Sequence, residues 1–322
     1  MNRRQLLQLG GATAIGFATG AARASQAAPV LDTHIHLFDP RRPGGVPWPE
    51  PNDPIYKPAL PRRYARIAEP FGIVGAIAIE ASPLPKDNDW VLRLIENEPI
   101  IVGFIGDLVP GDASFAQDLE RLHQNPRFLG IRCGNLWNRD FTKDAANPAF
   151  IDGLRRLASA GLTMDSANPD PALIAAVLRI SQQVPELRIV IDHLPHATLP
   201  TEPDALRSYQ ANLRALGANP RVYVKLSEIP VRIDGRVVTD VGHYRENLDA
   251  LWEIFGEDRV LFGSDWPNSD HVATYAETFH LAERYVDGKG AKAASRYFWR
   301  NSIAAYRWRP RTSAQQALES RG

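Results

Sequence analysis

Two histidines at alternate positions are the first residues in this sequence whose types and spacing could do chemistry. In the apolar run LDTHIHLF, residues 31–38, His34 and His36 are two residues apart, and Asp32 lies two residues before His34. On a β-strand, residues i and i+2 point to the same face, so the three side chains would share one face. Buried imidazoles are costly unless each finds a partner. The spacing therefore predicts metal ligands or hydrogen-bonding catalytic groups at a strand end.

Further polar residues stand where later apolar runs end. FGSDWP presents Asp265 followed by Trp266, and IDHLPH presents His193 and His196. Asp192 is adjacent to His193, so we expect it to face the other way and to be structural. The remaining residues of this kind are Glu80, Arg132, Asp165, Lys225 and Glu228.

Three of these residues have clear alternatives. Arg132 suits recognition of a carboxylate, but it would equally serve in an internal ion pair. Lys225 and Glu228 are equally consistent with functional groups and with loop-edge charges that meet water.

The elements that must position these residues alternate along the chain. Eight short, β-rich apolar runs are each followed by a helical pattern of apolar residues at three- and four-residue spacing. This arithmetic predicts an α/β protein with a single (β/α)8 TIM barrel, in which the C-terminal strand ends form the active face. A doubly wound open sheet is the alternative, but no glycine-rich phosphate loop follows the first run. The runs cover residues 30–38, 72–80, 101–109, 128–134, 161–167, 188–194, 222–228 and 259–265.

The two ends of the chain differ in composition from the middle. Residues 1–27 carry Arg3-Arg4, a mild Gly/Ala-rich stretch and an A-x-A pattern ending at Ala24, which resembles a bacterial twin-arginine signal peptide. A Sec signal or an uncleaved anchor is the alternative. We expect export through the twin-arginine machinery to the periplasm or beyond, a catalytic domain over residues 28–308, and a flexible tail over residues 309–322.

Composition excludes several classes of function. Equal numbers of basic and acidic residues, 37 each, argue against a nucleic-acid binder. The single Cys133 rules out an intrachain disulfide and a cysteine-based zinc site. Beyond the leader, no stretch approaches the ~18 consecutive apolar residues of a spanning helix, so we expect a mature protein outside the membrane. No coiled-coil pattern indicates a scaffold role or sets an oligomeric state.

Three motifs together resemble one family. DTHIH, IDHLPH and LFGSDWP, in this order at strand ends, are similar to the amidohydrolase-related barrels, and more narrowly to the branch of L-fuconolactonase and 2-pyrone-4,6-dicarboxylate lactonase. The resemblance covers residues 29–307. In the superfamily such strand ends surround one or two metal ions. Here IRCGN lacks the strand-four Lys or Glu, and LTMDSAN lacks the strand-five histidine.

The resemblance implies roles for the candidate residues. It makes Asp265 the base that activates water, with His34, His36 and His193 polarising the substrate carbonyl. If a metal is bound, it makes His34, His36 and Asp265 the ligands of one divalent ion, zinc or manganese, with Glu80 or His193 completing the set. The branch also includes enzymes that need no metal. Substrate-binding residues would be Arg132, Glu80, Trp137, His196 and Trp266, with Trp48 as a further wall.

We therefore expect a hydrolase that opens a small sugar or carboxylate lactone. The alternative is a metal-dependent, non-oxidative decarboxylase of an aromatic or unsaturated acid, which the missing strand-five histidine disfavours. A binding barrel without catalysis would have lost the paired histidines or Asp265, and both are intact. Specificity would lie in the loops 39–60 and 229–243, and the many prolines of the first predict an ordered wall.

Overall fold

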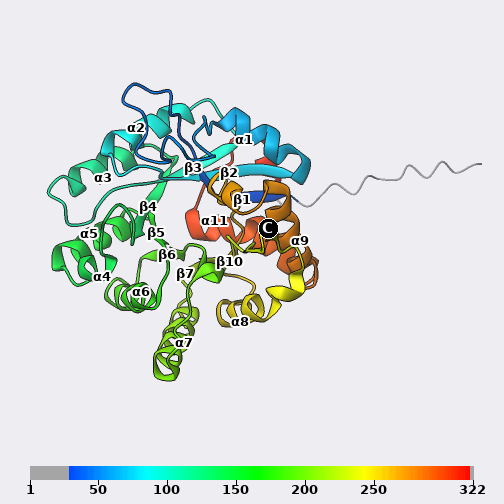
Figure 1. The fold of residues 1–322 in the computed structure, drawn as a ribbon. Coiled ribbons are helices and arrows are strands. Elements are labelled where there is room, and N and C mark those ends of the chain that lie inside the picture. The colour runs from blue at the N-terminus through cyan, green and yellow to red at the C-terminus, as the bar shows by residue number, and fades with distance from the viewer. Residues whose placement is uncertain (1–28, 320–322) are drawn as a thin grey trace, which may run out of the picture.

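Eight parallel strands form the centre of the structure, a computed structural model that describes residues 29–319. They pair in the order of the chain, and the helices surround them (Figure 1). The signal peptide expected over residues 1–27 lies outside the described residues. The strands are β1 (Val30–His36), β2 (Ile73–Ile79), β3 (Ile101–Gly106), β4 (Phe128–Gly134), β5 (Thr163–Ala167), β6 (Arg188–Ile191), β7 (Val222–Lys225) and β10 (Val260–Leu261).

The barrel closes between its first and last strands through the backbone. β10 has only two residues, but the chain continues beside β1. Phe262 O accepts from Thr33 N at 3.1 Å, and Asp265 N donates to His34 O at 2.8 Å. His36 N donates to Trp266 O at 2.7 Å. The predicted single (β/α)8 barrel is confirmed, and its closing seam brings Asp265 beside the paired histidines of β1.

The helices between the strands follow the predicted amphipathic patterns, and five of them begin with proline. Proline at the first helical position lacks only an N–H that would have no partner there, and its φ suits a helix. No helix among residues 29–319 is long and apolar enough to cross a membrane. The helices are α1 (Pro61–Ala68), α2 (Pro85–Leu94), α3 (Phe115–His123), α4 (Phe141–Asp144), α5 (Pro148–Ser159), α6 (Pro171–Gln183), α7 (Pro203–Ala218), α8 (Arg245–Phe255), α9 (Tyr275–Asp287), α10 (Ala291–Ser295), α11 (Asn301–Tyr306) and α12 (Ser313–Glu319).

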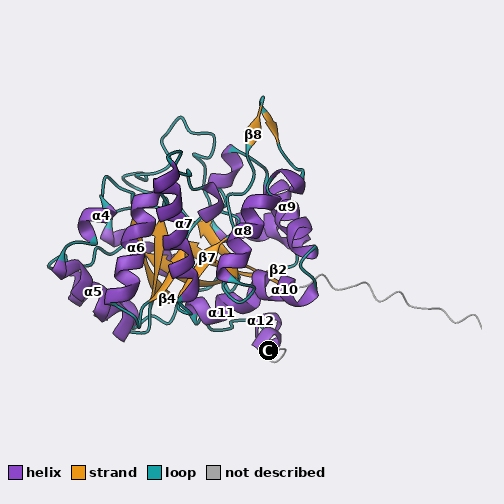
Figure 2. Cartoon of the chain, turned by 90° about the horizontal axis from the view of Figure 1, so that it is seen from below, coloured by secondary structure: helices purple, strands orange, loops and turns teal. Residues whose placement is uncertain are grey.

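The two ends of the barrel have different fillings. At the end where the strands begin, apolar side chains of the strands pack against aromatic residues of the C-terminal segment, among them Trp299, Tyr306 and Trp308. Figure 2 shows α11 and α12 at this end, opposite the hairpin of β8 (Arg232–Ile233) and β9 (Arg236–Val237). The end where the strands begin is thus packed with apolar groups, and the polar residues lie at the end where the strands finish.

The prediction of a flexible tail over residues 309–322 is wrong for residues 309–319. The Arg311 guanidinium donates to four backbone carbonyls between Ile95 and Ile101, and Gln315 Nε2 donates to Val74 O and Pro99 O. Leu318 is 1 % exposed. The polar composition of this segment suggested a solvated tail. Its arginine and glutamine instead donate hydrogen bonds to backbone carbonyls at this end of the barrel.

Loss of the Leu318 side chain is expected to destabilise the whole barrel. Leu318→Ala should lower the free energy of unfolding by about 2–3 kcal/mol, since it empties a buried site. Leu199→Ala is the matched control, because Leu199 is 53 % exposed. Urea unfolding followed by circular dichroism measures both. Equal stability of the two variants would show that α12 does not dock.

Candidate active site

A pocket of about 300 Å³ opens at the end of the barrel where the strands finish. Its floor is formed by side chains from β1 and the segments that follow β6 and β10, and its walls come from loops. These are the ends from which the sequence predicted the functional residues. The lining residues are His36, Trp48, Glu80, Ala81, Arg132, Leu136, Trp137, Asn168, His193, Glu228, Asp265 and Asn268.

One oxygen of Asp265 lies at the centre of the floor. Its Oδ1 is 3.1 Å from His36 Nε2, 3.4 Å from His34 Nε2 and 3.8 Å from His193 Nε2. Its Oδ2 accepts from Asn268 Nδ2 at 2.6 Å. Asp265 and His193 both have φ near +50° to +60°, a backbone conformation that turns their side chains inward just after their strands end. The structure thus brings together the four residues predicted as catalytic.

The imidazoles set the charge of this carboxylate. Burial by itself raises the pKa of Asp265, but His193, His36 and His34 outweigh it and hold the pKa well below its usual value. Burial lowers the pKa of His193 to about 4, although Asp265 and Asp192 oppose this. Burial and the nearby Lys225 ammonium also lower the pKa of His34. At neutral pH the floor therefore holds an ionised carboxylate and neutral His34 and His193.

A buried ion network lies directly below the floor. Lys225 is fully buried; its Nζ donates to Asp165 Oδ2 at 2.7 Å and lies 2.9 Å from Asp192 Oδ1. The same ammonium lies 3.1 Å from His34 Nδ1. Arg132 Nε donates to the other oxygen of Asp192 at 2.9 Å. Lys225 is thus a buried cation rather than a loop-edge charge.

Asp192 corrects a prediction from the sequence. Strict alternation placed it on the face opposite His193, as a structural residue. It lies inside the barrel, fully buried, because β6 ends at Ile191 and the left-handed turn at His193 breaks the alternation. Both side chains therefore point inward.

The hydrogen bonds fix which ring nitrogen carries the hydrogen in two of the histidines, His34 and His36. An ammonium has no lone pair, so Lys225 must donate to His34 Nδ1, which leaves the hydrogen of neutral His34 on Nε2, facing Asp265. His36 Nδ1 lies 3.0 Å from Glu80 O and 3.3 Å from Ile79 O, so it carries a hydrogen. The lone pair of His36 Nε2 would then face Asp265 Oδ1, and a proton or a metal ion must lie between them.

The donor set fits one divalent ion. Among the residues that the structure describes, ligand atoms of His34, His36 and Asp265 lie within 4.8 Å of one another, as do those of His193, Glu228 and Asp265. His34 Nε2 has no hydrogen-bond partner. To bind an ion, this nitrogen would have to transfer its hydrogen to Nδ1, which lies 3.5 Å from Asp192 Oδ1. A second ion does not fit on the strand-five side, because the Lys225 ammonium is paired with Asp165 there.

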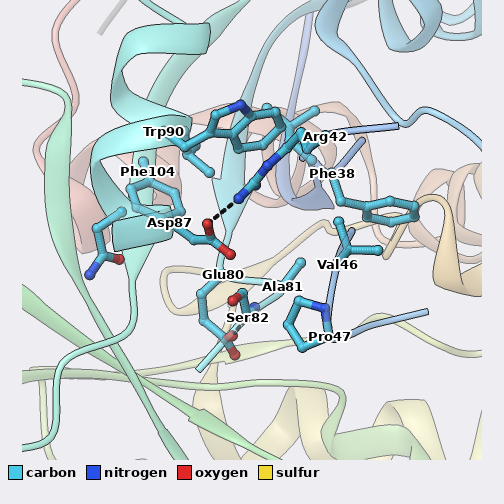
Figure 3. A pocket seen from close by; sticks show the side chains of 13 residues that line it. Phe38, Arg42, Val46, Pro47, Glu80, Ala81, Ser82, Asp87, Trp90 and Phe104 are labelled. Carbon is cyan, nitrogen blue, oxygen red and sulfur yellow. Dashed lines mark hydrogen bonds and ion pairs between the residues drawn. The ribbon is translucent and has the colours of Figure 1, made fainter. Parts of the chain in front are cut away.

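The walls of the pocket combine aromatic rings with carboxylates. Trp137 Nε1 donates to Glu80 Oε2 at 3.0 Å, and the Trp48 ring packs edge-on against His36 with centroids 5.4 Å apart. The loop that carries Trp48 is held to α2, because Arg42 pairs with Asp87 and lies over the Trp90 ring (Figure 3). This loop is the ordered wall that its prolines predict.

Two predicted substrate-binding residues lie elsewhere. Trp266 does not form a wall: it is fully buried below the pocket, against the Tyr64 ring and beneath the Arg63 guanidinium. His196 does not line the pocket either, because the short 3-10 turn Leu194–His196 carries it out to solvent. Arg132, Glu80 and Trp137, the other residues of that set, do line the pocket.

Two asparagines of the pocket were missed by the sequence analysis. Asn168 lies in a loop and Asn268 begins a short 3-10 turn, and strand periodicity gives no signal in either place. Asn268 bridges Asp265 and Glu228, with a 3.1 Å bond to Glu228 Oε1. The three-residue spacing from Asp265 in SDWPN was the only hint that it could face the same site.

Comparisons with known proteins agree with this geometry. The family described as Amidohydrolase matches residues 31–308. An L-fucono-1,5-lactonase of Burkholderia multivorans is 31% identical over 293 residues, which cover 85% of this chain and 94% of that one. An L-fucono-1,5-lactonase of Burkholderia ambifaria is 26% identical over 285 residues, 86% of this chain and 95% of that one.

Solved structures share the fold. A Burkholderia multivorans amidohydrolase with bound zinc superposes with a TM-score of 0.75 at 23% identity, covering 88% of this chain and 100% of that one. A manganese-bound 5-carboxyvanillate decarboxylase of Novosphingobium aromaticivorans has a TM-score of 0.60 at 16% identity, covering 88% of this chain and 97% of that one. Both show the barrel and no more than the barrel.

Removal of the buried ammonium is expected to destabilise the fold. Lys225→Met leaves Asp165 and Asp192 buried without their shared cation, which should lower the free energy of unfolding by about 3–5 kcal/mol. Adding Asp165→Asn should recover part of this loss. Lys143→Met is the control: it breaks an exposed pair with Asp140 and should cost under about 1 kcal/mol. Urea unfolding that gives additive effects for Lys225 and Asp165 would contradict the network.

The acid limb of the pH–rate profile is expected near pH 4. His193 stays neutral until the pH falls to its lowered pKa of about 4, whereas an unperturbed histidine would become charged near 6.5. Hydrolysis measured as kcat/KM should therefore stay level from pH 8 to 5 and fall below. Glu228→Gln is the control: if this variant gives the same profile, Glu228 is not the group whose protonation causes the fall in rate. A limb at pH 6.5 in both proteins would refute the assignment.

Proposed function

This chain belongs to the amidohydrolase family, and from that premise we propose that it hydrolyses a sugar lactone, with Asp265 activating the water. The observation that carries the proposal is the ionised Asp265 oxygen, ringed by three imidazoles at the floor of a pocket with acidic and aromatic walls. Two L-fucono-1,5-lactonases that match most of the chain support it.

The first chemical step follows from Asp265. A lactone is an ester, so water can attack its carbonyl carbon if a base removes a proton. The pKa of Asp265 lies well below its usual value, so the carboxylate is ready to accept this proton at neutral pH. The bond between water oxygen and carbonyl carbon forms as the proton moves to Asp265. When the ring C–O bond breaks, the proton returns to the leaving ring oxygen.

Arg132 is the group that supports the developing oxyanion in this proposal. It lines the pocket, and burial is outweighed by Asp192 and Glu80, so the pKa of the guanidinium is raised and it stays charged. Its Nε is held by Asp192 and its Nη1 lies 3.5 Å from Glu80 Oε1. A guanidinium held on two sides is a fixed donor, which stabilises a transition-state charge without reorganisation.

The charge of the pocket favours a neutral, hydroxylated lactone over a dicarboxylate. Arg132 is the cation among the lining residues and is already paired with Asp192 and Glu80, while the ionised Asp265 adds a further negative charge. Burial and the neighbouring Asp265 raise the pKa of Glu228 well above its usual value, which favours its neutral form. A substrate carboxylate would meet like charges there. Carboxylates and amides that accept hydroxyl hydrogens, with Trp48 and Trp137 beside them, suit a sugar ring.

We propose that hydrolysis requires no metal ion. The support is Lys225, which holds His34 with its hydrogen on Nε2, so that this nitrogen, 3.4 Å from Asp265 Oδ1, offers no lone pair to a metal ion. If an ion is bound, His34, His36 and Asp265 would hold it after His34 Nε2 transfers its hydrogen to Nδ1, and it would act as a Lewis acid on the carbonyl. The decarboxylase alternative has a structural neighbour of the same fold but needs a strand-five ligand, and Asp165 is occupied by Lys225.

Export of the folded enzyme through the twin-arginine machinery is part of the same proposal. Arg3-Arg4 and the A-x-A pattern before Ser25 support it. Changing both arginines to lysine should retain the precursor in the cytoplasm, which fractionation of the producing bacterium measures.

Loss of the Asp265 charge is expected to remove activity and preserve the fold. Asp265→Asn should lower kcat for a neutral aldonolactone by about 10²–10⁴-fold, the usual contribution of a general base. Asp270→Asn, in the 3-10 turn that begins three residues after Asp265, is the control. Proton release from a panel of neutral aldonolactones and a pyrone dicarboxylate lactone measures rate and specificity together. Full activity of Asp265→Asn, or preference for the dicarboxylate, would overturn the corresponding part of the proposal.

A further inference from the structure

A second hollow lies at the opposite end of the barrel from the active site. It has a volume of about 620 Å³ and is formed where β5, β6 and β7 begin. Four arginines from four separate segments contribute to its lining: Arg155 of α5, Arg188 of β6, Arg221 before β7 and Arg307 after α11. The interior at this end of the barrel holds a cluster of apolar side chains.

Arg188 and Arg307 converge at the base of this hollow. Arg188 is 5 % exposed; its Nε donates to Ala305 O at 2.9 Å, and its Nη2 donates to Gly161 O. Arg307 Nη1 reaches the same glycine, 3.6 Å from where a Cβ of Gly161 would stand. Burial, followed by the like charges of Arg307 and Arg221, lowers the pKa of Arg188 to about 10. Two guanidiniums therefore meet at one backbone position.

The positive charge of the hollow exceeds its acidic partners. Arg221 pairs with Glu186 at 2.8 Å, and Arg155 pairs with Asp152. Within residues 29–319, neither Arg188 nor Arg307 has an ion pair with a carboxylate. Glu186 is the acidic residue of the lining, and it is already engaged.

The Tyr223 side chain adds a polar group among these charges. Burial raises the pKa of its hydroxyl, while Arg188, Arg259, Arg221 and Arg307 all oppose that rise. Arg259 has no ion pair among the described residues either; its Nη1 donates to Asn219 O at 2.7 Å. Like charges gathered around one hydroxyl repel each other, and an anion bound between them would relieve that repulsion.

We propose that this hollow binds a phosphate group, either free inorganic phosphate or the phosphate of a small metabolite. Guanidinium forks from several segments match a multivalent, tetrahedral oxyanion better than a single planar carboxylate. Arg188 supplies the buried charge, and Arg307 and Arg221 close around the anion. The recessed position and the zero net charge of the chain favour a small molecule over a nucleic acid. The site is separate from the lactone pocket and independent of the proposed function.

Calorimetric titration of the full chain tests this inference. The probes are inorganic phosphate, pyrophosphate and glucose 6-phosphate, at constant ionic strength. We expect saturable binding, weakened roughly tenfold or more by Arg307→Glu, because a charge-assisted hydrogen bond is lost and the charge is reversed. Arg309→Glu is the matched control, since it makes the same change at an exposed arginine outside the hollow.

The outcomes separate the sources of the phosphate and the rival explanations. Tighter binding of glucose 6-phosphate than of inorganic phosphate indicates a metabolite, and the reverse indicates free phosphate; both support the site. No saturable binding of any probe overturns the proposal. So does an equal loss in Arg307→Glu and Arg309→Glu, because that would show only the general surface charge. Thermal unfolding of both variants confirms that each is folded.

Discussion

A fully buried ammonium is the constraint on which the rest of the active site depends. Lys225 lies between Asp165 and Asp192 inside the barrel, and its charge can remain there only because both carboxylates are within 3 Å. Removing the ammonium would leave two buried carboxylates without their shared cation. The pairing fixes the position of Lys225, and Lys225 in turn fixes the hydrogen of His34 toward Asp265. The network is thus a rigid floor for the reacting carboxylate.

The barrel stabilises this buried ion network because its interior is divided into an apolar layer and a polar layer. Apolar strand residues and the rings of Trp299, Tyr306 and Trp308 fill the lower layer and exclude water from below. The upper layer then holds charges close together in a region of low dielectric, where paired charges interact strongly. Tyr306 joins the layers, because its hydroxyl donates to Asp165 Oδ2 at 2.9 Å. The C-terminal segment therefore supports both the packing and the chemistry.

The sequence predicted the strands well because their apolar runs are buried on both faces, as in any parallel barrel. It predicted His34, His36, His193 and Asp265 as one site because each stands where such a run ends. It missed the inward direction of Asp192, because alternation holds only while the chain remains extended, and the turn at His193 departs from it. Trp266 and His196 were misplaced for the same reason, since loop conformation decides where residues beyond a strand point.

Long-range contacts explain the other differences. Nothing local to Lys225 shows that Asp165 stands opposite it, 60 residues away in the chain. The docking of Gln315 likewise depends on the carbonyls of Val74 and Pro99, more than 200 residues earlier. The closure of the barrel determines which residues become partners. The sequence around either partner alone does not indicate the other.

The most direct test of this account is hydrolysis of a neutral aldonolactone by protein stripped of metal with a strong chelator, with residual metal measured by mass spectrometry. If the imidazole ring and Lys225 suffice to prepare Asp265, the stripped protein should retain its kcat/KM, and added zinc or manganese should not raise it. Loss of activity on stripping, with recovery on adding zinc or manganese, would contradict the account and make His34, His36 and Asp265 metal ligands.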